Sequence, residues 1–496
     1  MIFSVAPTTP NVFTLREMKK EISFSKLWWL AAGAFAALYW LPGLFEHGLF
    51  IDGIYYGMQA QNLANGKATW FHLHGTSGLG TDFFGNPPMH IWILSLFFQL
   101  FHSAFFTEKF YSLLTFVATA FLLSRLWKLE FKNHVIGRET NDGSDNSALP
   151  ILFFLFIPLV PWCYSNNLME NTMTIFTTAS VYFIARFSST QKNIFLFSFL
   201  SSVFIFFGVL TKALPALFPL AAPVFILVGR KSFSPMKIIS FCALQIIFLS
   251  TFCFVLFSFP DAKNYLNMYR EEQLAPLFSH TLDNSKSNFS ILYDLFCQLI
   301  PLLIIVLLSL IISRKQKIKN SNTLRYFLIA LAASLPVMIT RKQSFFYLLP
   351  SLPFFAMTAS LFVEEQKEKV FSVLKLKNFQ RIKFITAISF SIVIVAMISL
   401  SVFNYGKISR DEAKLHDIFS LKNEVSSDKK VFISLDIVQD YSLHAYMWRY
   451  YETSCVPVNF ESEHILLAGK NSLVMISADS ISLIKKGEEY DIYKMK

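Results

Sequence analysis

The chain has 496 residues, of which 54% are hydrophobic and only 16% are charged. A soluble core could not bury so much apolar surface, so the composition excludes an ordinary soluble protein and indicates a bilayer as solvent. The formal net charge of +11 does not indicate a nucleic-acid partner, because Lys and Arg lie between the apolar runs and form no patterned basic helix.

Eleven apolar segments are predicted to span the membrane, because each approaches the roughly 20 residues with which a helix crosses about 30 Å of hydrocarbon. No small-x-small cleavage site follows the first segment, so we expect a retained helix and not a signal peptide. The segments are residues 27–45, 110–127, 149–164, 172–186, 193–209, 213–228, 238–258, 289–312, 326–340, 344–362 and 384–403.

The distribution of basic residues predicts the orientation of these spans. With the N-terminus inside, the inner segments contain 23 Lys and Arg and the outer segments contain 7, as the positive-inside rule requires. The apolar segment 88–106 is not counted as a span, since it would place the basic loop 128–147 outside. Polar residues interrupt its apolar face, which favours a helix lying in the membrane interface. A buried hairpin partner remains the alternative.

The composition changes after the last predicted span. Residues 430–436 and 472–477 have the pattern of strands, and helical patterns surround them. We therefore predict a membrane domain over residues 1–403 and a small soluble α/β domain over residues 404–496. Eleven spans place this second domain outside the cytoplasm.

Two acidic residues are predicted to lie at the outer membrane surface. Asp52 follows the first span in the outer loop 46–88, and Glu170 precedes the span 172–186 in the next outer loop. Because both loops are on one side, the two carboxylates can face one site. Each could instead be a solvated charge or favour the N-terminal end of a helix.

Cationic side chains on the outer side are few and lie beside short turns. Lys212 stands between two predicted spans, and Arg341 and Lys342 stand between two others. A phosphate could be bound there. Lysines at span ends ordinarily extend to the lipid headgroups, so each residue taken alone is weak support for such a site.

A metal site is not predicted. His72, His74, Asp82 and His90 lie in or near one loop, but the His-x-His pattern is common in polar loops, and the aromatic residues beside it favour an amphipathic lip. The five cysteines lack metal-ligand spacing and predict neither a zinc site nor a disulfide framework. We also expect no cofactor.

Four segments together resemble the family of membrane glycosyltransferases that use polyprenyl- or dolichyl-phosphate sugars, which includes protein O-mannosyltransferases and the lipid A aminoarabinose transferase. They are residues 52–56 (DGIYY) with 86–92 (NPPMHIW), 169–173 (MENTM), 208–212 (GVLTK) and 347–353 (YLLPSLP). Their order matches the family over roughly residues 25–362. The resemblance implies the GT-C fold and a polyprenyl-phosphate sugar as donor.

The sequence departs from this family at positions beside the first acid. Members often have a second acid or an arginine where this chain has Gly53 and Tyr55, and many have a charged pair where it has Gly85 and Asn86. The outer loop 260–288 looks like a loop of the family, and the resemblance assigns Arg270 in it to the donor phosphate.

The predicted reaction transfers a sugar to an acceptor outside the cytoplasm. The transfer needs a base for the acceptor hydroxyl and cations for the departing lipid phosphate. Asp52 fits the first role, Lys212 with Arg341 or Lys342 fits the second, and Glu170 would orient the donor sugar or the acceptor. The acceptor could be lipid A, a glycan or a protein. A transporter or flippase for a lipid-linked substrate is the main alternative, and a noncatalytic membrane scaffold is the third.

Overall fold

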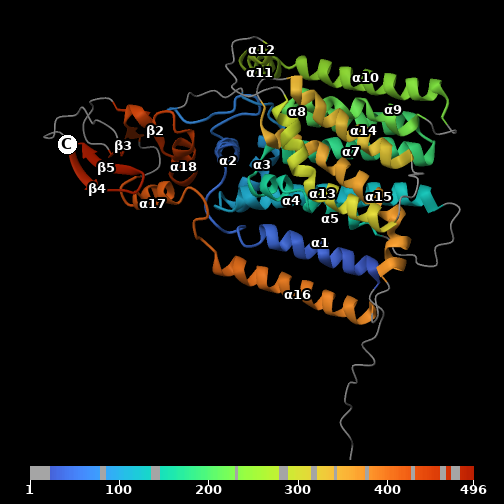
Figure 1. Cartoon of the computed structure of the whole chain (residues 1–496). Helices are drawn as coiled ribbons and strands as arrows, with labels where there is room; N and C mark the ends of the chain where they lie inside the picture. The colour runs from blue at the N-terminus through green and yellow to red at the C-terminus, as the bar shows by residue number, and fades with distance from the viewer. Residues whose placement is uncertain are drawn as a thin grey trace, which may run out of the picture.

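The computed structural model describes residues 23–78, 85–135, 146–228, 233–278, 289–313, 321–339, 343–374, 379–425, 430–458, 465–470 and 481–495. Long helices run side by side and form the body of the molecule, and a smaller part that contains a sheet lies beyond one end of them (Figure 1). The long helices are α1 (Phe24–Trp40), α4 (Thr107–Val135), α7 (Met169–Thr190), α8 (Ile194–Lys212), α10 (Pro235–Phe257), α13 (Ser290–Ser313), α14 (Ser321–Ser334), α15 (Leu352–Leu374) and α16 (Phe379–Phe403).

Each of the eleven predicted spans coincides with helix, but four of them are interrupted. The interrupted spans are α5 (Leu149–Leu155) with α6 (Leu159–Ser165), η1 (Leu214–Leu220) with α9 (Ala222–Leu227), α14 with η3 (Leu335–Ile339), and η4 (Phe345–Ser351) with α15. A proline lies in or beside each interruption, where it removes a backbone donor and clashes with the preceding turn. Within the described ranges, seven helical segments are long and apolar enough to cross a membrane. The number eleven therefore stays a prediction.

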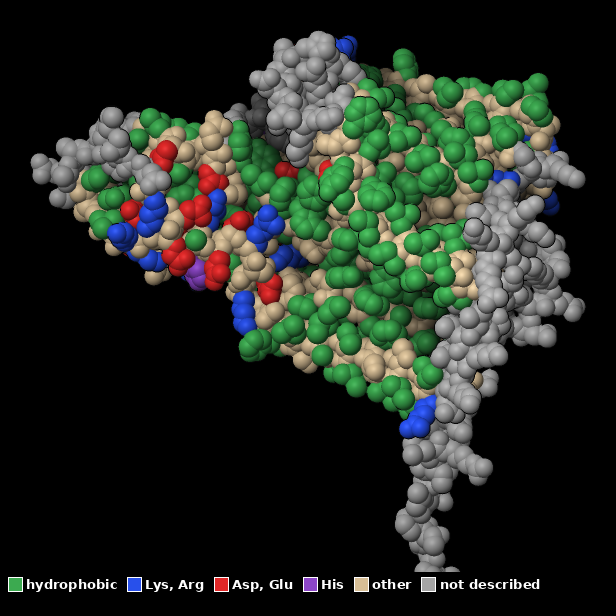
Figure 2. All heavy atoms as spheres, viewed as in Figure 1, with side chains coloured by type: hydrophobic (Ala, Val, Ile, Leu, Met, Phe, Trp, Pro, Cys, Tyr) green, Lys and Arg blue, Asp and Glu red, His purple; other side chains and the backbone are tan. Residues whose placement is uncertain are grey.

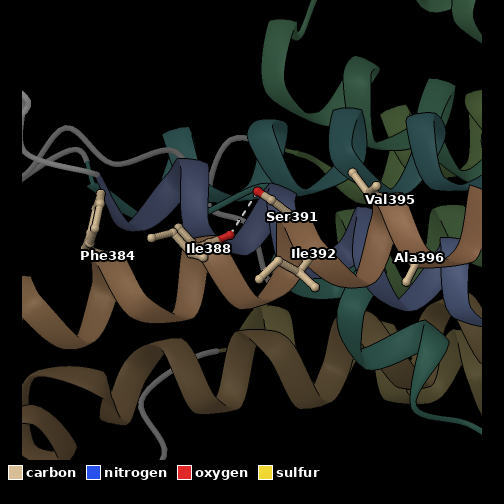
Figure 3. A pocket seen from close by; sticks show the side chains of 7 residues that line it. Phe384, Ile388, Ser391, Ile392, Val395 and Ala396 are labelled. Carbon is tan, nitrogen blue, oxygen red and sulfur yellow. Dashed lines mark hydrogen bonds between the residues drawn. The ribbon is translucent and has the colours of Figure 1, made fainter.

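On the face shown in Figure 2, apolar side chains cover most of the helical body, whereas charged side chains gather on the smaller part. The most exposed long helix is α16, whose apolar stretch is only 6% buried. One side of α16 forms a groove lined by Phe384, Ile388 and other residues of the same helix, without a charged side chain (Figure 3). Its one polar lining residue, Ser391, donates a hydrogen bond to the carbonyl of Ala387 at 3.0 Å. This surface suits contact with lipid.

Two short helices lie at the end of the body that faces the sheet. They are α2 (Ile51–Ala64) and α3 (Met89–Phe101), and they pack against each other. The 13 residues of α3 rise only about 20 Å, less than the roughly 30 Å of bilayer hydrocarbon. This length agrees with the prediction that the segment 88–106 does not span the membrane. Nearby, α11 (Pro260–Tyr269), the π-helical turn η2 (Arg270–Leu274) and α12 (Ala275–Phe278) follow one another.

The smaller part is an α/β unit with a five-stranded mixed sheet, in the order β2-β1-β3-β5-β4. Strand β1 pairs in parallel with β2 and β3, and β5 pairs antiparallel with β3 and β4. The predicted strand 430–436 overlaps β1, and the predicted strand 472–477 lies outside the described residues. The elements are α17 (Glu412–Ser420), β1 (Lys430–Ile433), η5 (Leu435–Ile437), α18 (Tyr441–Tyr451), β2 (Ser454–Pro457), β3 (Ile465–Gly469), β4 (Ile481–Lys485) and β5 (Tyr490–Met495).

The α/β unit shares its hydrophobic core with α2. Ile54 and Met58 of α2 are buried together with Leu443 and Met447 of α18. The Arg449 guanidinium of α18 also binds the carboxylate of Glu108 at the start of α4, with 2.7 Å between Nε and Oε1. The division at residues 403 and 404 stays a prediction, because the core crosses this boundary in space.

Candidate active site

A cavity of about 990 Å³ lies where the membrane helices meet the α/β unit. Three of the predicted site residues line it: Asp52 from α2, Glu170 from α7 and Lys212 from α8. Other lining residues come from η1, η2, η3, η4 and the first residue of α18. The structure therefore places both predicted acids and one predicted cation at a single site.

Glu170 and Lys212 form an ion pair. Helices α7 and α8 are consecutive, closely packed and joined by a three-residue turn, so the N-terminal end of α7 lies beside the C-terminal end of α8. The carboxylate and the ammonium group therefore each lie at the helix end whose dipole favours their charge. The side chains are 1% and 13% exposed, respectively. Lys212 thus does not extend to the lipid headgroups.

The ammonium group of Lys212 keeps hydrogen-bonding capacity beyond this pair. Within the described part of the chain it donates one hydrogen bond, to Glu170, whereas an ammonium group has three donors. Its Nζ also lies 4.4 Å from the ring centroid of Tyr347 and 5.7 Å from that of Phe346. An anion that enters the cavity can therefore bind Lys212 without displacing Glu170.

Contacts between α2 and the turn before α7 fix the position of Asp52. The Asn167 amide donates a hydrogen bond to the Gly53 carbonyl at 3.1 Å, and the Phe50 N–H donates one to the Asn166 side chain at 3.1 Å. A Cβ atom on Gly53 would come within 2.1 Å of the Asn166 carbonyl oxygen. Close backbone contact thus explains why a larger residue cannot follow Asp52. Asp52 lies within electrostatic reach of both Glu170 and Lys212.

Arg270, another predicted phosphate ligand, does not line the cavity. Arg270 is 65% exposed and lies 3.5 Å from Glu271, although its neighbour Tyr269 lines the cavity. Arg341 and Lys342 lie outside the described residues. Ile339 and Ser344, on either side of them in the sequence, do line the cavity.

Several tyrosines line the site without having been assigned to it from the sequence. They are Tyr55, Tyr56, Tyr269, Tyr347 and Tyr441. Tyr55 follows Asp52 by three residues on α2, so helical spacing could have placed the two on one face. Burial raises the pKa values of Tyr55 and Tyr269 to about 12, which keeps their hydroxyl groups protonated at neutral pH. No local signal could have found Tyr441, because it comes from the other end of the chain.

Of the four residues weighed for a metal site, His72, His74 and His90 lie within the described part of the chain. No group of three or more His, Cys, Asp or Glu side chains with a metal-binding arrangement occurs in the described ranges, and Asp82 lies outside them. His90 is fully buried, and its Nδ1 is 2.9 Å from the hydroxyl of Thr172.

No protein-family model and no curated protein matches the chain. Among solved structures, it is similar to ArnT from Cupriavidus metallidurans bound to undecaprenyl phosphate, with 12% sequence identity and a TM-score of 0.67 over 94% of this chain and 98% of that one. The chain has the ArnT fold. ArnT in the apo state gives 11% identity and a TM-score of 0.66 over 94% of this chain and 97% of that one.

The ArnT fold confirms the predicted fold class, a GT-C-like polytopic membrane protein with a small C-terminal α/β unit. ArnT is the lipid A aminoarabinose transferase, so the family resemblance predicted from the sequence is confirmed at the level of the fold. A weaker likeness, with a TM-score of 0.45 and 11% identity over 88% of this chain and 65% of that one, links the chain to the oligosaccharyltransferase AglB from Archaeoglobus fulgidus.

Proposed function

We propose that this protein is a membrane glycosyltransferase that transfers a sugar from a polyprenyl-phosphate carrier to an acceptor outside the cytoplasm. The observation that supports it best is one cavity lined by both charged and apolar residues. Asp52 and the Glu170–Lys212 pair line it, and so do apolar side chains of η1 and η3. A lipid-linked sugar phosphate likewise combines a charged half and an apolar half.

Much of the apolar lining comes from η1 and η3. Leu217 and Phe218 of η1 and Pro336 and Val337 of η3 contribute to it. Ile339 also lines the cavity and is 71% exposed, so the cavity reaches the protein surface beside η3. A polyprenyl chain can enter from the bilayer, where its apolar chain exchanges lipid contacts for protein contacts with no hydrophobic cost.

The polar residues can divide the transfer between them. Asp52 accepts the proton of the acceptor hydroxyl, whose oxygen attacks the anomeric carbon of the sugar. The bond between that carbon and the phosphate oxygen breaks, and polyprenyl phosphate leaves with the electron pair. Lys212 stabilises the phosphate charge, and Glu170 holds Lys212 in position. Attack from the face opposite the phosphate inverts the anomeric configuration.

The same arrangement argues against a transporter or flippase. Such proteins place functional charges near the membrane midplane between repeated halves. Here Asp52, Glu170 and Lys212 line the same cavity as Tyr441 of the α/β unit. We assign the protein to a bacterial cell membrane, and the excess of Lys and Arg in the predicted inner loops supports an orientation with this cavity outside. A topology reporter fused after Lys496 should then report a position outside the cytoplasm.

Release of polyprenyl phosphate tests the proposal. Purified protein in lipid nanodiscs would be incubated with a panel of polyprenyl-phosphate sugars and with lipid A, an oligosaccharide or a Ser/Thr peptide as acceptor. We expect release with at least one donor, and loss of release in the Asp52→Asn variant. Movement of a labelled donor across a liposome bilayer without any release would contradict the proposal and favour the flippase.

A further inference from the structure

We propose that Tyr441 of the α/β unit, together with Tyr55 of α2, forms the acceptor subsite and holds the acceptor hydroxyl against Asp52. The inference rests on the proposed function and assigns a specificity role to the α/β unit. Tyr441 is the one described residue after position 403 that lines the cavity. The α/β unit therefore reaches the reaction site through this side chain.

The side chain of Tyr441 has no role in the core of its own unit. It is 45% exposed, whereas Leu443 and Ala445 on the same helix are fully buried in the core that joins α18 to α2. A large aromatic residue that stands at a helix start and faces a cavity buries little surface within its unit. Its position suits contact with a ligand.

The residue before Tyr441 fixes the start of α18 rigidly. Asp440 accepts hydrogen bonds from the Leu443 N–H at 3.1 Å, from Lys414 at 2.5 Å and from the Tyr490 hydroxyl at 2.5 Å. Burial raises the pKa of Asp440, but the hydrogen bonds from Lys414, Tyr490 and Ser442 outweigh it and lower the pKa to about 2. The carboxylate is therefore charged at neutral pH and keeps Tyr441 in a preorganised position.

Tyr55 connects Tyr441 to the proposed base. It lies three residues after Asp52 on α2, which places the two side chains on one face of the helix. Tyr55 and Tyr441 line the same cavity, and they are close enough to interact electrostatically. Two phenol hydroxyls can donate hydrogen bonds to an acceptor, and their rings can pack against it.

This subsite is separate from the binding region proposed for the donor lipid. Much of the apolar lining comes from η1 and η3 of the membrane body, whereas Tyr441 belongs to α18 of the unit beyond that body (Figure 1). An acceptor that arrives from the aqueous side would meet Tyr441 first. Substitution of Tyr441 should therefore change the KM for the acceptor and leave donor binding unchanged.

The test compares acceptor-dependent and acceptor-free release of polyprenyl phosphate in the full-length protein. Lipid A, an oligosaccharide and a Ser/Thr peptide serve as the acceptor probes, and water is the acceptor in their absence. We expect Tyr441→Ala to raise the acceptor KM by roughly three- to tenfold and to lower acceptor-free release, in which water is the acceptor, by a smaller factor. Tyr441→Phe, which keeps the ring, should give a smaller increase, and so should Tyr55→Phe.

Tyr405→Ala is the matched control, because Tyr405 is also exposed (61%) and does not line the cavity. It should leave the acceptor KM unchanged. An unaltered KM in Tyr441→Ala, or an equal loss of both kinds of release in a folded protein, would overturn the inference. A parent protein whose release no acceptor accelerates would also overturn it, but would leave the donor half of the proposed function standing. A parent without any release would instead refute the proposed function.

Discussion

Two buried ion pairs in this protein have similar chemistry and different surroundings. Arg449 and Glu108 join the α/β unit to α4, and their side chains are 3% and 1% exposed. Lys212 and Glu170 join α8 to α7, and their side chains are 13% and 1% exposed. Both pairs connect residues that are far apart in the sequence or in different helices.

The two cations differ in how completely their donors are used. The guanidinium of Arg449 binds both oxygens of Glu108 and the backbone carbonyls of Ser103 and Ala104, at 2.7 to 3.2 Å. Lys212 makes a single hydrogen bond within the described part of the chain and faces a cavity. Arg449 uses four of its five N–H donors and so serves to hold the structure together, whereas a pair with two unused donors beside a cavity can bind a ligand. Burial alone therefore does not separate a structural ion pair from a functional one.

The largest expected effect is on the junction pair. Arg449→Met leaves the Glu108 carboxylate buried without its partner, and breaking such a pair costs about 3–5 kcal/mol. We expect the free energy of unfolding to fall by this amount, as measured by denaturant or thermal unfolding in detergent. Glu108→Leu added to Arg449→Met should restore part of the loss. Unchanged stability in the single variant would show that this pair is not structural.

Asp52 belongs to neither ion pair. The loss of turnover expected from its substitution is the value with which the effects at the two pairs are compared. Asp52→Asn keeps the shape of the side chain and removes the proposed base, so turnover should fall by about a hundredfold or more. Binding of the donor should persist, because the phosphate contacts remain. Single-turnover kinetics and donor binding in nanodiscs measure the two quantities separately. Turnover at the parent rate would rule out Asp52 as the base.

A smaller effect is expected at the cavity pair. Lys212→Met removes one charge-assisted contact of roughly 1.5–3 kcal/mol to the donor phosphate, so donor affinity should fall by about ten- to a hundredfold. Lys237→Met is a suitable control, because Lys237 lies at the start of α10 and does not line the cavity. If Lys212→Met bound the donor as tightly as the parent, the cavity pair would be structural like the junction pair.

The smallest effect concerns the pH dependence of the junction. Burial and the nearby charges of Lys109 and Arg449 lower the pKa of His47 from 6.5 to about 4, and its Nδ1 is 2.9 Å from the Tyr450 hydroxyl. Between pH 6.5 and 4 the unfolded chain binds a proton that the folded protein does not, so acidification through this range should lower stability. The melting temperature measured against pH should show this slope.

His47→Gln has no titrating group and should reduce the slope between pH 6.5 and 4. Because His47 is only half-buried, we expect a modest change in melting temperature. A slope equal to that of the parent would mean that other groups cause the acid sensitivity.

The residues of the candidate site were only partly predictable from the sequence. Asp52, Glu170 and Lys212 could be placed on one side of the membrane by counting basic residues in the loops, and the structure brings all three to one cavity. The position of the Arg270 side chain could not be predicted in this way. Arg270 is the first residue of a π-helical turn, and the geometry of that turn sets the direction of the side chain. That turn leaves it exposed beside Glu271.

The sequence by itself determined where the long apolar helices of the membrane body lie and that an α/β unit follows them, because the length and spacing of apolar residues are local properties. It did not determine α2 or α11, which lie in the predicted outer loops 46–88 and 260–288. Only the tertiary structure decided that Glu170 pairs with Lys212, that a loop packs on Gly53, and that Tyr441 reaches the cavity. These contacts join residues far apart in the chain. They depend on how whole helices and the sheet pack, which no local pattern records.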